Sequence, residues 1–407
     1  MNPEQISIKD FFYELPAARI AQYPLKERDQ SKLLVYHEGK ITESIYAQLP
    51  QHIPPASVLI FNNTKVVQAR MFFKNNKEEN IELFCLEPAT GKDMAISMST
   101  CGKVQWKCLV GRAYKWKEKI IHFSSPEISI QAEIVGRTSS SFIIEFRWEP
   151  LQLSFAEVLQ RSGVIPIPPY LKRTTETSDL ERYQTIYALH EGSVAAPTAG
   201  LHFTESLLTQ LVSQNIHPLY LTLHVGAATF KPVKAETMGE HEMHSEWIDV
   251  PVSSIEKILS ALNNTPLITV GTTSLRTTES LYWLGVKEIL GLNEASDIPV
   301  LEQWDAYQLK SKNISPRQAL EALCERIRRT KSDRLIAKTS LLIVPGYSLK
   351  LADALITNFH QPESTLMLLV ASILGEDWKK VYQYALDNDF RFLSYGDGSL
   401  LWRQKKL

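Results

Sequence analysis

Strand-like and helical stretches alternate through the second half of the chain, and this pattern limits the possible folds more than any other feature. The strand-like runs are residues 219–225, 266–270, 340–344 and 354–359. Helical stretches lie between them, including residues 254–262 and a helix that begins at Ser274. Such alternation is typical of α/β domains, in which helices connect the strands of one sheet. We therefore expect a main α/β domain with a largely parallel or mixed sheet.

A region of different character interrupts this domain. Its short runs of alternating and β-branched residues are 81–86, 104–110, 128–135 and 142–146. Several short strands at close spacing favour a small barrel or sandwich. The proline-rich segment 164–170 that follows is expected to be an extended connector. The sequence thus predicts a discontinuous α/β catalytic domain (1–70 and 155–407) with a smaller, inserted, all-β barrel-like domain (71–154).

Composition narrows the class of protein. With 407 residues, of which 44% are hydrophobic, the chain can bury a large core. Its start lacks the pattern of a signal peptide, and its longest apolar run, 366–374, is too short to cross a bilayer. The four cysteines include no Cys-x-x-Cys pair and are expected to be reduced thiols. We expect a cytoplasmic monomer without membrane contact. The net charge of −1 does not itself indicate a partner, because attraction of charged partners depends on local charged patches.

The loops that follow the predicted strands are polar or rich in small residues. They are 223–226, 270–276, 344–347 and 357–360. In an open α/β sheet such loops form the ligand crevice. Asn358 and His360, in the last of these loops, are therefore expected to contact substrate.

The turn Gly271-Thr272-Thr273-Ser274 opens a helix. Its free N–H groups, hydroxyls and helix dipole favour a carboxylate or phosphate, although an ordinary N-cap has the same composition. Arg276 and Glu279 follow at a spacing that allows them to pair. On a surface this pair would contribute only about 0.2–0.5 kcal/mol. At the carboxyl end of a strand, the same residues could bind a charged substrate.

The segment 195–204 combines a proline, a small-residue turn and a histidine just before a helix. Ala199 and Gly200 permit close approach of a ligand to the backbone, and Thr198 and Gly200 are expected to contact substrate. His202 could act as a general base or a hydrogen-bond donor. A structural histidine at a helix entry is the alternative interpretation of this segment.

His241 and His244 lie three residues apart beside Glu242. This spacing could place metal ligands on one helix face, but it is not the His-Glu-x-x-His pattern and no cysteine pair accompanies it. We therefore predict a polar, substrate-facing loop and no metal.

Basic and aromatic residues are interleaved between residues 101 and 120. The aromatic ones are Trp106, Tyr114 and Trp116, and the basic ones include Lys103, Arg112, Lys115, Lys117 and Lys119. Cations neutralise phosphates and aromatic rings stack on unpaired bases, so the pattern favours RNA binding. A solvated strand face is the alternative.

A set of short motifs extends over nearly the whole chain. In the first part they are Tyr13-Glu14-Leu15-Pro16, Tyr23-Pro24, Arg28-Asp29 and Phe61-Asn62-Asn63-Thr64-Lys65. In the second part they are Pro168-Pro169-Tyr170, Glu181-Arg182-Tyr183-Gln184, 195–204, Leu223-His224-Val225-Gly226, His241-Glu242-Met243-His244, 271–280, Pro345-Gly346-Tyr347, Thr357-Asn358-Phe359-His360 and Ser394-Tyr395-Gly396-Asp397. Through these motifs the chain resembles the S-adenosylmethionine:tRNA ribosyltransferase-isomerases of queuosine biosynthesis.

The resemblance implies tRNA as partner, S-adenosylmethionine as co-substrate and no resident cofactor. The ribosyl group would move onto 7-aminomethyl-7-deazaguanine at the tRNA wobble position, leaving epoxyqueuosine and releasing adenine and methionine. The sulfonium acidifies the adjoining 5′ carbon, so the enzyme needs a base, an acid for adenine and an anchor for the methionine carboxylate. The acid/base candidates are His202, His224, Glu279 and Asp397, and the anchor candidate is the turn 271–276.

The chain departs from the pattern of the family at three places. Gly226-Ala227-Ala228-Thr229-Phe230 stands where Gly-x-Gly-Thr-Phe is expected, Lys74-Asn75-Asn76-Lys77-Glu78 replaces a Lys-Thr-Gly-Gly turn, and Gly398-Ser399 replaces alanine and methionine. These departures indicate a divergent member. The alternative functions are a catalytically silent RNA-binding paralogue of the same fold and a transferase that uses S-adenosylmethionine without RNA.

Overall fold

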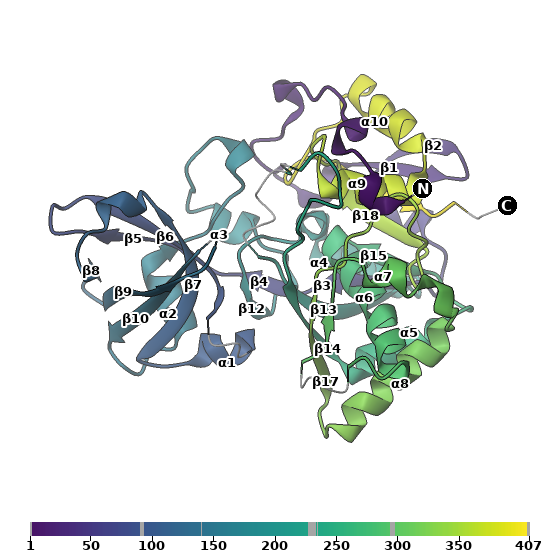
Figure 1. The fold of residues 1–407 in the computed structure, drawn as a ribbon. Coiled ribbons are helices and arrows are strands. Elements are labelled where there is room, and N and C mark those ends of the chain that lie inside the picture. The colour runs from purple at the N-terminus through teal and green to yellow at the C-terminus, as the bar shows by residue number, and fades with distance from the viewer. Residues whose placement is uncertain are drawn as a thin grey trace.

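The computed structural model describes residues 2–89, 93–139, 141–226, 233, 235–293 and 298–404. A large mixed sheet with helices forms one part of the molecule, and an antiparallel barrel forms the other (Figure 1). The predicted fold class, an α/β main domain with a smaller barrel-like all-β part, is confirmed. The domain boundaries at residues 70 and 155 stay predictions.

The large sheet has ten strands drawn from both ends of the chain. In spatial order they are β16 (Val300–Leu301), β17 (Arg334–Thr339), β14 (Glu246–Pro251), β13 (His217–His224), β3 (Val58–Asn62), β15 (Leu267–Val270), β18 (Ala354–Asn358), β19 (Gly398–Trp402), β1 (Lys32–His37) and β2 (Lys40–Ile45). At its centre, β13, β3, β15 and β18 are mutually parallel. Their carboxyl ends therefore lie at one edge, where a ligand crevice is expected.

The strand β19 lies between two strands that are far apart in the sequence. It pairs antiparallel with β18 and parallel with β1, with Gly398 opposite both Asn358 and Leu33. The last strand thus joins the centre of the sheet to the β1–β2 hairpin.

Helices cover the large sheet. The α-helices of the described residues are α1 (Met94–Ser99), α2 (Phe155–Ser162), α3 (Asp179–Arg182), α4 (Glu205–Ser213), α5 (Val252–Ala261), α6 (Thr272–Ile289), α7 (Asp305–Gln308), α8 (Pro316–Arg329), α9 (Thr365–Leu374) and α10 (Asp377–Asp387), of which α1 and α2 lie beside the barrel (Figure 1). The longest, α6, is buried along most of its length. Gly285 allows its close packing on α8, because a Cβ atom there would lie 2.1 Å from the carbonyl oxygen of Ala319.

The second part is a six-stranded antiparallel barrel. Its strands in order are β5 (Arg70–Lys74), β6 (Asn80–Pro88), β7 (Lys103–Gly111), β10 (Phe142–Glu149), β9 (Ser129–Arg137) and β8 (Ile120–Ser124), and β11 (Gly163–Val164) adds to β5. Pairing of Lys74 with His122 closes the barrel. Trp106 and Phe155 lie in its core with ring centroids 4.7 Å apart. The helix α2 therefore packs into the barrel through Phe155.

The barrel and the main sheet share hydrophobic contacts. Trp247 of β14 and Val194 belong to the same buried cluster as the barrel core. The short parallel pair β4 (Thr64–Val66) and β12 (His190–Ser193) lies between the two parts (Figure 1). Gly192 in β12 has φ +142°, and a Cβ atom there would lie 2.3 Å from Met94 of α1. This junction therefore requires glycine.

The predicted strand at residues 340–344 is wrong, because the paired strand is β17, which ends at Thr339. Side chains satisfy the backbone of the following segment instead. Tyr307 donates its hydroxyl hydrogen to the carbonyl of Leu342 and accepts from the N–H of Val344. Extended backbone with an apolar sequence was thus mistaken for a strand.

No described helix is long and apolar enough to cross a membrane.

Candidate active site

A cleft of about 900 Å³ opens at the carboxyl ends of β13, β15 and β18. All of the predicted substrate-binding residues line it except Gly200 and Ser274. Those that line it are Thr198, His241, His244, Gly271, Thr272, Thr273, Arg276, Asn358 and His360. The resemblance motifs at 168–170 and 195–199 contribute further lining. Segments far apart in the sequence thus converge on one cavity.

The amino-terminal end of α6 forms part of the cleft wall. Gly271 is its N-cap residue and has φ +91°, a conformation that favours glycine. Because glycine has no side chain, Gly271 provides no side-chain cap for the first N–H groups of the helix. Thr273 accepts a hydrogen bond from the amide of Asn62 at 3.2 Å, and the hydroxyl of Ser274 donates to the carbonyl of Val270 at 2.7 Å. Ser274 therefore stabilises the helix entry instead of facing the cleft.

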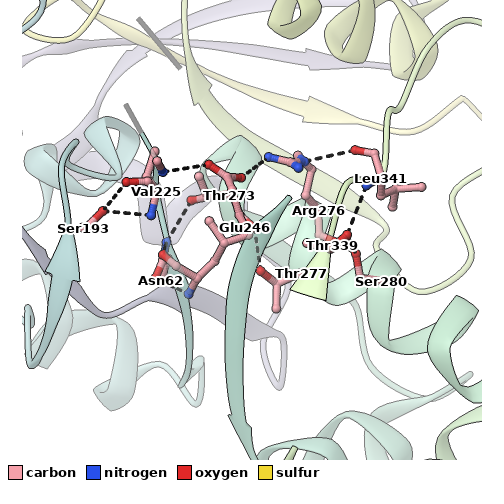
Figure 2. Close-up of polar contacts among 12 residues, drawn as sticks. Asn62, Ser193, Val225, Glu246, Thr273, Arg276, Thr277, Ser280, Thr339 and Leu341 are labelled. Atoms are coloured by element: carbon pink, nitrogen blue, oxygen red, sulfur yellow. Dashed lines mark hydrogen bonds and ion pairs between the residues drawn. The ribbon is translucent and has the colours of Figure 1, made fainter. Parts of the chain in front are cut away.

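Arg276 is held at two of its three nitrogen atoms (Figure 2). Its Nε donates to the carbonyl of Leu341 at 3.1 Å, and its Nη1 pairs with Glu246. Its Nη2 is buried and has no hydrogen-bond partner among the described residues. A buried donor without an acceptor costs free energy, so this nitrogen favours a ligand oxygen.

Glu246 is a cleft residue that the sequence motifs did not indicate. It begins β14 and lies beside Arg276 (Figure 2), and its Oε1 accepts from the N–H of Gly226 at 3.1 Å. Glu246 thereby ties the end of β13 to Arg276. A single glutamate at the start of a strand has no distinguishing sequence signal.

His202 lies behind the cleft wall rather than in its lining. It is buried, and its ring stacks on Tyr46 with centroids 4.2 Å apart. Its Nε2 contacts the amide nitrogen of Asn358 at 3.3 Å, and Asn358 accepts from Thr198 at 2.9 Å. Burial lowers the pKa of His202 to about 3. His202 is therefore neutral at pH 7 and supports Asn358 and Thr198, which do line the cleft.

His224 and His360 are likewise neutral. Burial lowers the pKa of each to about 3. The Nδ1 of His224 lies 3.0 Å from the hydroxyl of Thr64, and the Nε2 of His360 lies 2.9 Å from that of Thr357. His360 lines the cleft, whereas His224 is outside its lining.

Glu279 and Asp397 are buried carboxylates outside the lining of the cleft. Glu279 accepts from the hydroxyl of Tyr347 at 2.7 Å and from the N–H groups of Lys350, Leu351 and Ala352 at 2.8–3.1 Å. Burial raises its pKa, and these hydrogen bonds oppose the shift. Glu279 therefore fixes the loop that follows the segment 340–344.

Asp397 has a similar arrangement near the end of the chain. It accepts from the backbone N–H of Lys32 at 2.9 Å and from that of Arg391 at 2.7 Å. Burial raises its pKa. Asp397 thus joins the start of β1 to the loop that precedes β19.

The two histidines of the 241–244 motif lie in a loop rather than on a helix. His241 is half-buried and His244 is exposed. Burial, followed by the charge of His244, lowers the pKa of His241. No group of three potential ligands that could hold a metal ion occurs among the described residues.

The three buried histidines should make stability depend strongly on pH. An unfolded histidine titrates near pH 6.5. Because His202, His224 and His360 have lowered folded-state pKa values, the unfolded chain binds more protons as pH falls below that value. We expect the free energy of unfolding to fall between pH 6 and pH 4 by about 1.4 kcal/mol per pH unit for each histidine. Urea denaturation at several pH values measures this slope.

Two variants serve as comparisons for that measurement. His360→Asn should flatten the slope, because it removes one titrating group. His217→Gln, at an exposed position, should leave the slope unchanged. Equal slopes for the wild type and His360→Asn would contradict the assignment.

The barrel buries some residues of the predicted basic and aromatic patch and leaves others exposed. Trp106 and Trp116 are buried, and Tyr114 is exposed. Lys103, Lys115 and Lys119 pair with Glu145, Glu79 and Glu133 respectively. Arg112 and Lys117 are exposed, and their charged groups have no carboxylate partner within the described part of the chain. The patch is therefore less positive than its sequence indicates.

Two of the three sequence departures lie in described residues. In the turn after Arg70, the Oδ1 of Asn75 accepts from the N–H groups of Lys77 and Glu79, both at 2.9 Å. At Gly398 a Cβ atom would lie 2.0 Å from the hydroxyl oxygen of buried Tyr46, so glycine fits this site. The Ala227-Ala228 substitution lies outside the described residues.

Comparisons with known proteins support the motif-based resemblance. A family model described as queuosine biosynthesis protein matches residues 8–401. An S-adenosylmethionine:tRNA ribosyltransferase-isomerase of Finegoldia magna is 35% identical over 399 residues, which cover 96% of this chain and 97% of that protein. A protein of the same name from Aromatoleum aromaticum is 33% identical over 398 residues, 97% of each chain.

A solved structure also resembles this chain. It is that of S-adenosylmethionine tRNA ribosyltransferase from Thermotoga maritima, which has a TM-score of 0.46, 24% sequence identity, and coverage of 96% of this chain and 99% of that one. The family assignment depends on the family model and the two relatives, which match nearly the whole sequence. They confirm the resemblance, and the chain belongs to the queuosine biosynthesis protein family.

Proposed function

We propose that the chain is an S-adenosylmethionine:tRNA ribosyltransferase-isomerase. It transfers and isomerises the ribosyl group of S-adenosylmethionine onto 7-aminomethyl-7-deazaguanine at the tRNA wobble position. The products are epoxyqueuosine-tRNA, adenine and methionine. The observation that carries this proposal is the convergence of the resemblance motifs on one cleft of about 900 Å³. That volume lies within the usual range for ligand sites, roughly 300–1,000 Å³.

Arg276 is the proposed anchor for the methionine carboxylate. Its Nη2 is a buried donor without a partner among the described residues, and the uncapped start of α6 lies in the same wall. A guanidinium and a helix amino terminus both favour an anion. The hydrogen bonds of Nε and Nη1 hold the guanidinium in place before the ligand binds, which lowers the entropy cost of ordering the side chain on binding.

The proposed acid/base groups are the histidines that line the cleft. These are His241, His244 and His360. Because its pKa is lowered, His241 is neutral at pH 7 and can accept a proton from the acidified 5′ carbon. His202, His224, Glu279 and Asp397 lie outside the lining and have the supporting contacts described above. Their proposed role is to hold the walls of the cleft.

One assay tests the proposed function. The purified chain is incubated with S-adenosylmethionine and tRNA that carries 7-aminomethyl-7-deazaguanine, and free adenine and the modified nucleoside are measured. We expect adenine release only with this tRNA. Binding of RNA without turnover would instead identify a catalytically silent paralogue. Turnover without RNA would identify a different transferase.

The proposed tRNA-binding surface of the barrel is tested by salt dependence. Arg112 and Lys117 are unpaired within the described chain, whereas Lys107 pairs with Glu87 at 2.7 Å. Replacing Arg112 and Lys117 together with alanine should weaken tRNA binding and reduce the slope of log K against log salt by about 0.7–0.9 for each phosphate that the protein no longer neutralises. Lys107→Ala is the matched control and should leave the slope unchanged. An unaltered slope in the double variant would show that Arg112 and Lys117 are ordinary solvated residues that do not contact tRNA phosphates.

A further inference from the structure

An ion pair forms part of the cleft wall. Glu246, at the start of β14, and Arg276, in the second turn of α6, both line the cleft. Their side chains are in direct contact and are 6% and 11% exposed. The wall therefore presents a negative and a positive group side by side (Figure 2).

Both members of the pair keep unused hydrogen-bonding capacity. A guanidinium has five N–H donors, and a carboxylate accepts at about four positions. Arg276 uses Nε for the carbonyl of Leu341 and Nη1 for Glu246, while Nη2 is buried without a partner among the described residues. Glu246 accepts from Arg276 and from the N–H of Gly226. The pair can therefore bind a further acceptor and a further donor at once.

We infer that Glu246 and Arg276 together recognise the zwitterionic α-amino acid end of the ligand. The ligand carboxylate binds Nη2 of Arg276, and the α-ammonium binds the carboxylate of Glu246. This inference rests on the proposed function, because S-adenosylmethionine carries such an end. The two ligand charges are attached to one carbon atom, so the residues that bind them must be neighbours. Glu246 and Arg276 meet this condition.

Other acidic residues fit this role less well. Glu240, Glu242 and Glu363 also line the cleft. Glu240 and Glu242 are exposed, and Glu363 is half-buried, but none of the three pairs with Arg276 among the described ion pairs. Charge interactions with water-exposed groups are weak, whereas those with buried groups are stronger. Among the described acidic residues of the lining, Glu246 is the one that pairs with Arg276. An arginine alone would bind any ligand with a carboxylate. Glu246 adds a preference for ligands that also carry an amine.

The test compares equilibrium binding of three probes to the full chain. The probes are S-adenosylmethionine, the analogue that lacks the α-amino group and the analogue that lacks the carboxylate. The wild-type chain should bind S-adenosylmethionine roughly tenfold or more tightly than the deaminated analogue, the factor expected for one hydrogen bond to a charged group. In Glu246→Gln this ratio should fall to about one. The ratio cancels any general loosening of the cleft, because both ligands meet the same protein.

The matched control is Glu288→Gln. Glu288 pairs with Arg326, and both side chains are buried, but neither residue lines the cleft. This variant should keep the wild-type ratio. An undiminished ratio in Glu246→Gln overturns the inference, and if the enzyme still transfers the ribosyl group, the proposed function stands. A wild-type ratio near one overturns the inference even if the variant fails to fold. Failure of the wild-type chain to bind S-adenosylmethionine overturns both the inference and the proposed function.

Discussion

Replacement of Arg276 by lysine is expected to weaken binding of S-adenosylmethionine by about ten- to a hundredfold, the effect of losing a hydrogen bond between charged groups. Lysine keeps the positive charge beside Glu246 but lacks the planar fork, so it cannot hold both Glu246 and a ligand carboxylate in fixed directions. The carboxylate-free analogue should bind the wild type and Arg276→Lys with similar affinity. Isothermal titration calorimetry measures both effects.

The control for this prediction is Arg326→Lys. Arg326 is as buried as Arg276 and pairs with Glu288 at 2.9 Å, but it lies outside the cleft lining. Its replacement should leave ligand affinity unchanged. Wild-type affinity in a folded Arg276→Lys chain would reject Arg276 as the anchor. Arg276→Ala is a less informative variant, because loss of one partner of a buried pair destabilises by about 3–5 kcal/mol.

Replacement of Glu279 by alanine is expected to lower the free energy of unfolding by at least about 3 kcal/mol. Four donors lose their acceptor in a fully buried site, namely the hydroxyl of Tyr347 and the N–H groups of residues 350, 351 and 352. Glu279→Gln keeps the shape of the side chain but turns an amide toward some of these donors, so we expect an intermediate loss. Urea denaturation measures both values.

Glu256→Gln is the control for the glutamate series. Glu256 pairs with Arg328 at an exposed position, where such a change alters stability by no more than about 0.5–1 kcal/mol. The same variants separate a supporting role of Glu279 from the acid/base role predicted from sequence. If Glu279→Gln loses adenine release more than a hundredfold while its stability matches the wild type, Glu279 takes part in the chemistry. Loss of stability with turnover retained in the folded fraction supports the structural role.

The sequence predicted the architecture because its signals were local. Alternating strands and helices indicated the mixed sheet, and closely spaced β-branched runs indicated the barrel. The prediction of a strand at 340–344 failed because an apolar extended run looks the same whether its backbone pairs with another strand or with a side chain such as Tyr307.

The alternation within β7 also distinguishes its two faces. Val104, Trp106 and Cys108 are buried, whereas Lys103 is exposed. Residues two apart on a strand share a face, so Trp106 had to point into the barrel if Lys103 faced solvent. The alternation of buried and exposed residues in this strand is therefore the sequence signal that places Trp106 in the barrel core and not on an RNA-binding surface.

The cleft was predictable in part. The motifs at strand ends include Arg276, Asn358 and His360, which line the cleft because the ends of parallel strands meet at one edge. Burial was not visible in the sequence, and it decides that His202 and Glu279 lie behind the walls. Glu246 was not predicted from the sequence, because its partner Arg276 is thirty positions away in the chain.

The position of β19 has a consequence for how the protein is made. The barrel strands all lie within residues 70–164, so the ribosome releases them early and they can pair with one another at once. The large sheet has a gap between β18 and β1 that only residues 398–402 fill. While translation continues, the nascent chain therefore carries a finished barrel beside an incomplete sheet with open strand edges. Open edges of this kind can pair with other chains, so the incomplete sheet is exposed to aggregation until residues 398–402 are added.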